Sequence, residues 1–329
     1  MVPQESVLVM LVRLVDRLPL PPSVSTSPRP HGRPRVYSDR LFLKAVVIML
    51  VRRLTTAYEL LSVLAEPTAE MQTLRLLLLE QDRLPCRRTF ERRLAALPAT
   101  LPAQIGCVGR YLVAVLQPWL ASARAAAIDS TVLRACGGVW HKKDREAGVV
   151  PHSSIDTEAS WTKSGWHGWV YGWKLHLVCA VGAIWIPLAA LLTPAAEADN
   201  TQAPALIREL PLELRFLLGD QHYRDPDLED LCALRGCILV TPMGGPYPHT
   251  DAGVEVRRIL HKTRSVTSEN FNAQFKGIFG GHQQVPTRGL VATQRFALGA
   301  IFVYQLSLLQ RFEQGADLRV GLKAFLKAA

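Results

Sequence analysis

Residues 125–131 read AAAIDST and residues 216–223 read FLLGDQHY, and these two stretches decide the class of fold. Each is a short apolar run of the kind that forms a buried strand, and each ends in an aspartate, Asp129 or Asp220. Ligands and catalytic groups gather at the carboxyl ends of strands in open α/β sheets. An aspartate after a strand is also a common turn former or helix cap, so neither residue alone establishes a site.

Strands and helices alternate around these two stretches. Residues 170–181 and 184–192 are apolar runs on either side of a short turn, and they predict a β-hairpin. Further along, the pattern predicts helices over residues 226–234, from about residue 266 and over 296–310, and a strand over 237–241. This order predicts an α/β fold within residues 123–315, with a mixed sheet flanked by helices.

An uncharged run over residues 177–196 is long enough to cross a bilayer. Gly182, Pro187 and Pro194 interrupt it, and two buried strands joined by a turn explain it better. We therefore expect no membrane partner. The six cysteines are scattered without the spacing of zinc ligands, which indicates reduced thiols in a cytoplasmic protein.

Residues 38–122 predict an all-helical unit that opens at Ser38, a helix cap followed by apolar residues at helical spacing. The residues before it, 1–37, form a basic segment rich in Pro and Ser, and residues 316–329 form a C-terminal tail. The predicted organisation is therefore a DNA-binding helical domain followed by the α/β domain.

The last helix predicted in that unit, CRRTFERRLAAL at residues 86–97, is rich in arginine. A helix of this kind can lie in or along a groove of DNA, although a solvated helix face has the same pattern. The arginines that we expect to contact DNA are Arg87, Arg88, Arg92 and Arg93.

The charge of the chain also favours a polyanionic partner. The formal net charge is +10, and residues 1–120 hold 16 Lys/Arg against 9 Asp/Glu, an excess of 7. Neutralised phosphates release counterions, so such an excess suits nucleic acid. An anionic membrane surface would suit the same charge.

A third carboxylate completes a candidate metal site. Glu269 lies in TSENFNAQFK, residues 267–276, on a predicted helix whose Phe271 and Phe275 share one face. We expect this apolar face to pack on the sheet and to turn Glu269 towards the strand ends. Glu255 is a rival, but it follows a Gly/Pro-rich stretch and lacks the aromatic face.

Three carboxylates together suit Mg²⁺ or Mn²⁺, which prefer hard oxygen ligands. Two metal ions held in this way can activate a water or a 3′-hydroxyl and stabilise the leaving oxygen of an in-line displacement. The acids Asp129, Asp220 and Glu269 therefore predict metal-dependent phosphoryl-transfer chemistry.

At these residues the sequence resembles the DDE transposases of bacterial insertion sequences, in the group around insertion-sequence families 4 and 5. The resemblance covers most of residues 38–312. Each motif alone is unspecific, whereas their order and spacing together are specific. The motifs are IDST at 128–131, VYGWKLHLV at 170–178, LLGDQHYRD at 217–225, SENFNAQFK at 268–276 and ALGAIFVYQLSLLQRF at 297–312.

The resemblance implies an RNase H-like catalytic core in which Asp129, Asp220 and Glu269 are the catalytic residues and the ligands of Mg²⁺ or Mn²⁺. It implies strand cleavage and strand transfer, with the terminal inverted repeats of an element and a target as the double-stranded DNA partners. Synapsis of two DNA ends requires at least a dimer. Such a protein works at the nucleoid in the cytoplasm.

Two positions depart from the pattern of this group, which often has Tyr, Arg and Lys at fixed steps around the Glu. Lys276 fits, seven positions after Glu269. The Arg position holds Ser265, with Arg264 one residue earlier, and the Tyr position holds Lys262. We expect Arg264 and Lys276 to contact DNA.

Lys174 is a further candidate for DNA contact. It lies two residues before His176 on a predicted strand, so both side chains share one face. That face either meets DNA or is solvated.

Two other functions remain open from the sequence. The same fold can serve a nuclease without strand transfer. An inactive descendant could act as a DNA-binding repressor, although such a copy need not keep Asp129, Asp220 and Glu269.

Overall fold

The strand that opens with three alanines, β1 (Ala125–Arg134), lies inside the sheet. β3 (Gly168–Ala180) pairs with it antiparallel on one side, and β5 (Phe216–Leu218) pairs with it parallel on the other. The computed structural model describes residues 6–19, 21, 36–117, 124–165, 168–242, 251–280 and 283–328.

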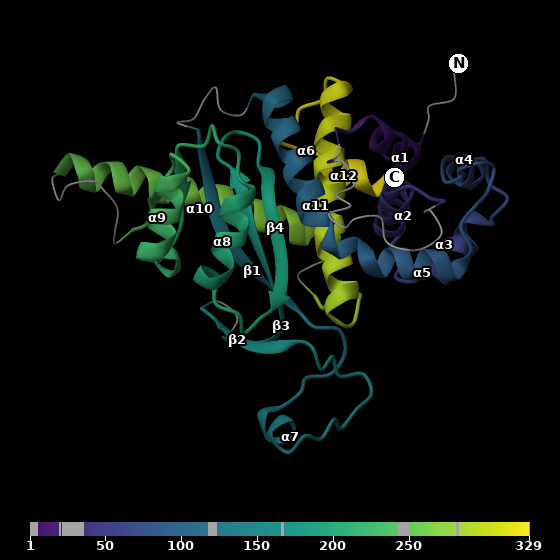
Figure 1. Ribbon diagram of the computed structural model, residues 1–329, viewed down its shortest axis with the longest axis horizontal. Coiled ribbons are helices and arrows are strands. Elements are labelled where there is room, and N and C mark those ends of the chain that lie inside the picture. Colours follow the sequence, from purple (N-terminus) through teal and green to yellow (C-terminus); the bar gives the residue numbers. More distant parts are fainter. Residues whose placement is uncertain are drawn as a thin grey trace, which may run out of the picture.

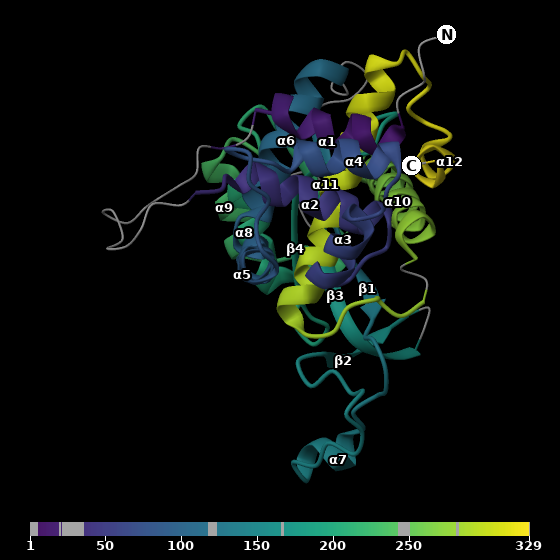
Figure 2. The same cartoon turned by 90° about the vertical axis from the view of Figure 1, so that its right-hand side faces the viewer.

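Three outer strands complete the sheet (Figure 1). β4 (Ile186–Pro194) pairs antiparallel with β3, and β6 (Ile238–Val240) pairs parallel with β5. β2 (Ser160–Ser164) pairs with the first residues of β3. The segment between β1 and β2 carries the short helix α7 (Lys142–Glu146) and extends away from the sheet (Figures 1 and 2).

Helices cover both faces of this sheet. α8 (Asp199–Glu209) packs on β3 and β4, and α9 (Pro226–Leu234) packs on β6. α10 (Asp251–Phe279) contacts β1, β3 and β5 and passes behind the sheet in the view of Figure 1, with α8 in front. The RNase H-like mixed sheet flanked by helices is thus confirmed.

The N-terminal part is helical, as predicted. Ser38 accepts a hydrogen bond from the Leu41 amide, and Thr56 forms a capping box with Glu59, so two of these helices begin at side-chain caps. The helices are α1 (Val7–Arg17), α2 (Asp39–Val51), α3 (Ala57–Leu64), α4 (Ala69–Leu77), α5 (Arg87–Ala96), the 3₁₀ turn η1 (Leu97–Ala99) and α6 (Leu101–Leu116).

One long helix, α11 (Leu290–Glu313), joins the helical part to the sheet. It packs on α1 and α2 on the one hand and on α6 and β4 on the other. Inside this contact the buried Gln305 amide donates to the carbonyls of Ile105 and Pro187, both at 2.9 Å. A single hydrophobic cluster covers both parts, and the boundaries at residues 122 and 315 stay predictions.

Several helices of the structure were not predicted from the sequence. α6 was not among the predicted helices; its Pro102 stands in the first turn, where a missing amide proton costs nothing. α1 lies within residues 1–37, the segment predicted to be basic and rich in Pro and Ser, and it has a buried apolar face. α8 and α12 (Leu322–Lys327) were not expected either, and α10 begins well before residue 266.

Among the described residues, no single helix is both long and apolar enough to cross a membrane. The segments Arg87–Ala99 and Leu101–Leu116 together meet that length and composition, but they are bent by 63° at their junction.

Gly109 sets how closely α6 approaches β4. A Cβ at this position would lie 2.4 Å from the Pro187 carbonyl oxygen, whereas one at Gly106 would meet nothing closer than 3.4 Å. We expect Gly109→Ala to lower the free energy of unfolding by about 1–3 kcal/mol, because β4 must move away. Gly106→Ala, on the same helix, should be neutral or gain up to about 1 kcal/mol from helix propensity. Urea denaturation of both variants measures the difference, and equal stabilities would contradict this packing.

Candidate active site

The pairing of β1 with β5 places the two predicted aspartates side by side. Ala127 pairs with Leu218 in parallel register, and Asp129 and Asp220 each lie two residues further on. Side chains alternate along a strand and neighbouring strands lie about 4.8 Å apart, so both carboxylates emerge on the same face at the same level. The sequence prediction that these residues meet is consistent with this register.

Asp129 is largely buried and carries an unusual proton affinity. Its carboxylate accepts a hydrogen bond from the Ser130 amide at 2.9 Å and lies 3.6 Å from the guanidinium of Arg264. The pKa of Asp129 is raised to about 6: burial is the largest cause and the charges of Asp220 and Asp199 add to it, while Arg264 and the Ser130 amide act in the opposite direction. Its negative charge is therefore only partly compensated.

Asp220 lies at the start of a short 3₁₀ turn, η3 (Gln221–Tyr223). One carboxylate oxygen accepts from the His222 amide at 2.8 Å, and the other lies 3.1 Å from Nδ1 of His222. The turn thus fixes this carboxylate beside Asp129.

The helix α10 presents Arg264, not Glu269, to this pair. Arg264 is buried and shares its face with the buried Ser268, Phe271 and Phe275, whereas the side chain of Glu269 is exposed. At 3.6 residues per turn, positions five apart point about 140° away from each other. The expectation that the apolar face turns Glu269 towards the strand ends is therefore corrected, because that face carries Arg264.

No metal cluster of three acids is assembled here. Within the residues that the structure describes, no three His, Cys, Asp or Glu side chains lie close enough together to hold a metal ion. Asp129 and Asp220 fit a divalent cation, since both offer hard oxygen donors and the charge of Asp129 is only partly compensated. The third ligand predicted, Glu269, is not part of this arrangement, and the rival Glu255 is exposed and paired with Arg258 at 2.7 Å.

Lys276 lies at the margin of the site. It is half-buried, and burial lowers its pKa, as does the charge of Arg134, while Asp129 raises it. The contact with DNA that was predicted for Lys276 stays a prediction.

Lys174 does not lie on the surface. Its ammonium group donates to the Glu197 carbonyl at 2.7 Å and lies 3.3 Å from Asp199, and the residue is only 8% exposed. The predicted contact of Lys174 with DNA therefore has no exposed side chain to support it, because the strand face that it shares with His176 is covered by α8.

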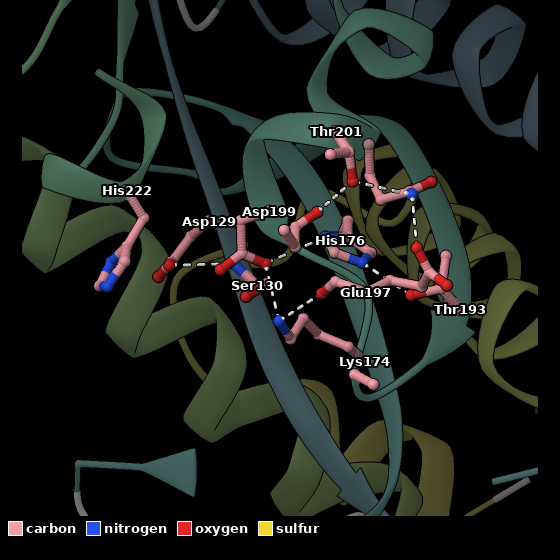
Figure 3. A network of polar contacts seen from close by, with 12 residues as sticks. Asp129, Ser130, Lys174, His176, Thr193, Glu197, Asp199, Thr201 and His222 are labelled. Atoms are coloured by element: carbon pink, nitrogen blue, oxygen red, sulfur yellow. Dashed lines mark hydrogen bonds and ion pairs between the residues drawn. The ribbon is translucent and has the colours of Figure 1, made fainter. Parts of the chain in front are cut away.

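Asp199, the first residue of α8, was not among the site residues expected from the sequence. Figure 3 shows its carboxylate close to Ser130 and to the side chains of Lys174 and His176. Burial raises its pKa, but hydrogen bonds from His176 and Ser130 and the charge of Lys174 outweigh this and hold the pKa at about 2. The one signal in the sequence was a lysine and a histidine on one strand face, which need a counter-charge when that face is buried.

The arginines of α5 divide into two groups. Arg87, Arg88 and Arg92 are exposed, and Arg87 pairs with Glu91 at 3.0 Å. Arg93 instead forms an ion pair with Asp39 and lies over the ring of Phe42, so it holds α5 to α2.

A mixed sheet of this order, flanked by helices and with acids at the ends of two neighbouring central strands, is the RNase H-like arrangement expected from the sequence. The sequence matches the family of the transposase DDE domain over residues 121–306, which is more than half of the chain. The protein therefore belongs to the DDE transposase family.

Individual proteins are more distant. No curated protein matches this sequence. Among solved structures, a piggyBac transposase synaptic complex with hairpin DNA is similar with a TM-score of 0.41 and 10% identity, covering 98% of this chain and 76% of that chain. A Mos1 transposase paired-end complex with the left transposon end gives 0.23 and 13%, covering 87% and 80%.

The raised pKa of Asp129 makes stability depend on pH in the metal-free protein. The group ionises near pH 3.8 in an unfolded chain and at about 6 here, so its charge costs folding free energy that is absent at low pH and complete above about pH 6. Asp129→Asn should therefore gain stability relative to the wild type as the pH rises from about 4 to 7, by about 1–3 kcal/mol. Urea unfolding in EDTA, with the exposed Asp230→Asn as control, measures this; a difference that is constant with pH would contradict it.

Proposed function

We propose that this chain is a transposase of the bacterial insertion-sequence type that cuts and joins DNA with divalent metal held by Asp129, Asp220 and Glu269. The DDE family accounts for transposition-type DNA cleavage and transfer in general. The residues, the metal and the kind of element are the proposal. The observation that carries it is the pair of aspartates set in register at the ends of β1 and β5.

Asp129 and Asp220 would hold the metal, for which Mg²⁺ or Mn²⁺ suits the oxygen donors. When bound, such ions activate a water or a 3′-hydroxyl and stabilise the leaving oxygen of an in-line displacement at phosphorus. His222 contacts Asp220 through both its amide and its ring, and this fixes the carboxylate for its task.

Glu269 completes the triad in this proposal when α10 presents a different face to the strand ends. Lys276 lies on the same side of the helix as Glu269, two turns further on, and already interacts with Asp129. A change of the face towards Glu269 would separate Arg264 from Asp129. Arg264 would then be available for a DNA phosphate.

Double-stranded DNA is the proposed partner, in the form of terminal inverted repeats and target DNA. The exposed arginines of α5 and the net charge of +10 support this. Two DNA ends must be brought together for transfer, so the proposed active form is at least a dimer at the nucleoid.

Two alternative functions are consistent with part of these observations. A nuclease of this fold would cleave but not join DNA. A repressor would bind DNA without cleavage, but a largely buried carboxylate such as Asp129, whose charge costs stability, has no purpose in a repressor.

Substitution of the acids tests the function. Asp220→Asn and Glu269→Gln should each lower metal-dependent cleavage of DNA that carries the sequences flanking the gene, by about a thousandfold or more. Removal of several kcal/mol of transition-state stabilisation corresponds to such a factor. Exposed acids provide matched controls, Asp230→Asn on α9 and Glu255→Gln on α10, and both should keep wild-type rates.

The products of the same reactions separate the alternatives. Joining of a cleaved end to a target plasmid supports the transposase, and cleavage without joining supports the nuclease. Wild-type protein that binds DNA but never cleaves it in Mg²⁺ or Mn²⁺ would support the repressor. If Glu255→Gln is inactive and Glu269→Gln is active, the third acid is misassigned.

The exposed arginines of α5 should contribute to DNA affinity through phosphates. The double variant Arg88→Ala/Arg92→Ala should weaken binding to all sequences alike and lower the salt slope of the binding constant by about 2, roughly 0.9 for each phosphate that is no longer neutralised. Fluorescence anisotropy with a labelled duplex over a range of salt measures the slope. Arg208→Ala, an exposed arginine on α8, is the control; an unchanged slope in the double variant would show that α5 does not contact DNA.

A further inference from the structure

A buried polar network lies on the face of the sheet opposite to Arg264. Asp199 begins α8, and its Oδ1 lies 3.3 Å from Nζ of Lys174 and 3.3 Å from Nδ1 of His176. The other ring nitrogen of His176 lies 2.9 Å from the Thr193 hydroxyl. Both neighbours of Asp199 belong to β3, so the carboxylate is tied to the sheet from two positions (Figure 3).

This network reaches Asp129 through Ser130. Ser130 lies directly across from His176 in the pairing of β1 with β3, and its hydroxyl donates a hydrogen bond to Asp199. The amide of the same Ser130 donates to the carboxylate of Asp129 at 2.9 Å. Asp199 therefore holds the residue whose amide orients Asp129.

Tyr223 connects the network to Asp220. It ends η3, its amide donates to the Asp220 carbonyl, and its buried ring packs so tightly on Gly219 that a Cβ there would lie 2.8 Å from the Cβ of Tyr223. Its buried hydroxyl has no hydrogen-bond partner among the described residues. Burial and the charges of Asp199, Asp129 and Asp220 raise the pKa of Tyr223 well above 10, so the hydroxyl stays protonated and remains a hydrogen-bond donor.

We propose that Asp199 and Tyr223 are positioning residues that fix the carboxylates of Asp129 and Asp220 for metal binding, from the side of the sheet opposite to α10. The proposal rests on the function proposed above. Asp199 acts on β1 through Ser130. Tyr223 acts on the turn that carries Asp220, and its hydroxyl, which has no partner among the described residues, would donate to a carboxylate of the pair when metal is bound. The proposed role of either residue needs no contact with the DNA or the metal.

The test measures Mn²⁺ affinity of the full chain directly, by electron paramagnetic resonance of free Mn²⁺, well below the melting temperature of each variant. Removal of a group that orients metal ligands typically costs 10–100-fold in affinity. Asp199→Asn should raise the Kd for Mn²⁺ about tenfold, and Tyr223→Phe, which keeps the ring on Gly219, should raise it several-fold. Asp230→Asn, an exposed acid on α9, should leave it unchanged.

A second readout needs no metal. Hydrogen exchange of the peptide that spans β1 should accelerate in Asp199→Asn but not in Asp230→Asn, because the hydrogen bond from the Ser130 hydroxyl is weakened. A merely structural role would lower the melting temperature without changing the Kd for Mn²⁺. An unchanged Kd in Asp199→Asn and Tyr223→Phe overturns the inference, whatever the melting temperatures are.

The variant Asp129→Asn distinguishes failure of this inference from failure of the proposed function. If Asp129→Asn abolishes Mn²⁺ binding while Asp199→Asn and Tyr223→Phe do not weaken it, only the inference is overturned. If Asp129→Asn itself leaves Mn²⁺ binding unchanged, the metal site does not use this pair, and the proposed function and the inference are both overturned.

Discussion

The parallel pairing of β1 with β5 is the constraint on which the candidate site depends. Only three residues of β5 take part, and they end directly before Gly219 and Asp220. A slip of one residue would move Asp220 to the other face of the sheet, away from Asp129. The short strand is held in register by β6 on its other edge, and Gly219 leaves the space that Tyr223 fills beneath the turn.

Charged residues on both faces of the sheet affect the carboxylate of Asp129. Asp199 stays ionised because His176, Lys174 and Ser130 stabilise its charge, and its charge in turn raises the pKa of Asp129. On the other face, Arg264 supplies part of the missing positive charge at 3.6 Å. The charge of ionised Asp129 is thus only partly compensated by Arg264, and a bound cation would complete the compensation.

Much of the fold could be predicted because short apolar runs in the sequence indicate both the strands and the residues at which they end. The runs before Asp129 and Asp220 are short and uninterrupted, and the caps Ser38 and Asp225 mark helix starts that the structure confirms. The third acid was harder, because periodicity identifies the apolar face of a helix but not which polar residue borders that face. Here Arg264 borders that face, and Glu269 is exposed. Asp199 could not be predicted for a different reason: its partners Lys174 and His176 are more than twenty residues away in the sequence, and only the folding of β3 against α8 brings them together. In a sequence, a lone aspartate at the start of a helix indicates only the ordinary favourable interaction with the helix dipole.

The way the helical part joins the sheet decides where a change of conformation can occur. Gln305 joins α6 and β4 to α11 inside one continuous core, so the helical part has a fixed place relative to the strand ends. α10 differs, because its first half exposes Val254, Val256 and Ile259 and only its second half buries Phe271 and Phe275. A helix packed over half its length can change the face that it presents at lower cost than an element packed over all of it. The proposed exchange of Arg264 for Glu269 at Asp129 would therefore be a change within α10 and would leave the register of β1 and β5 intact.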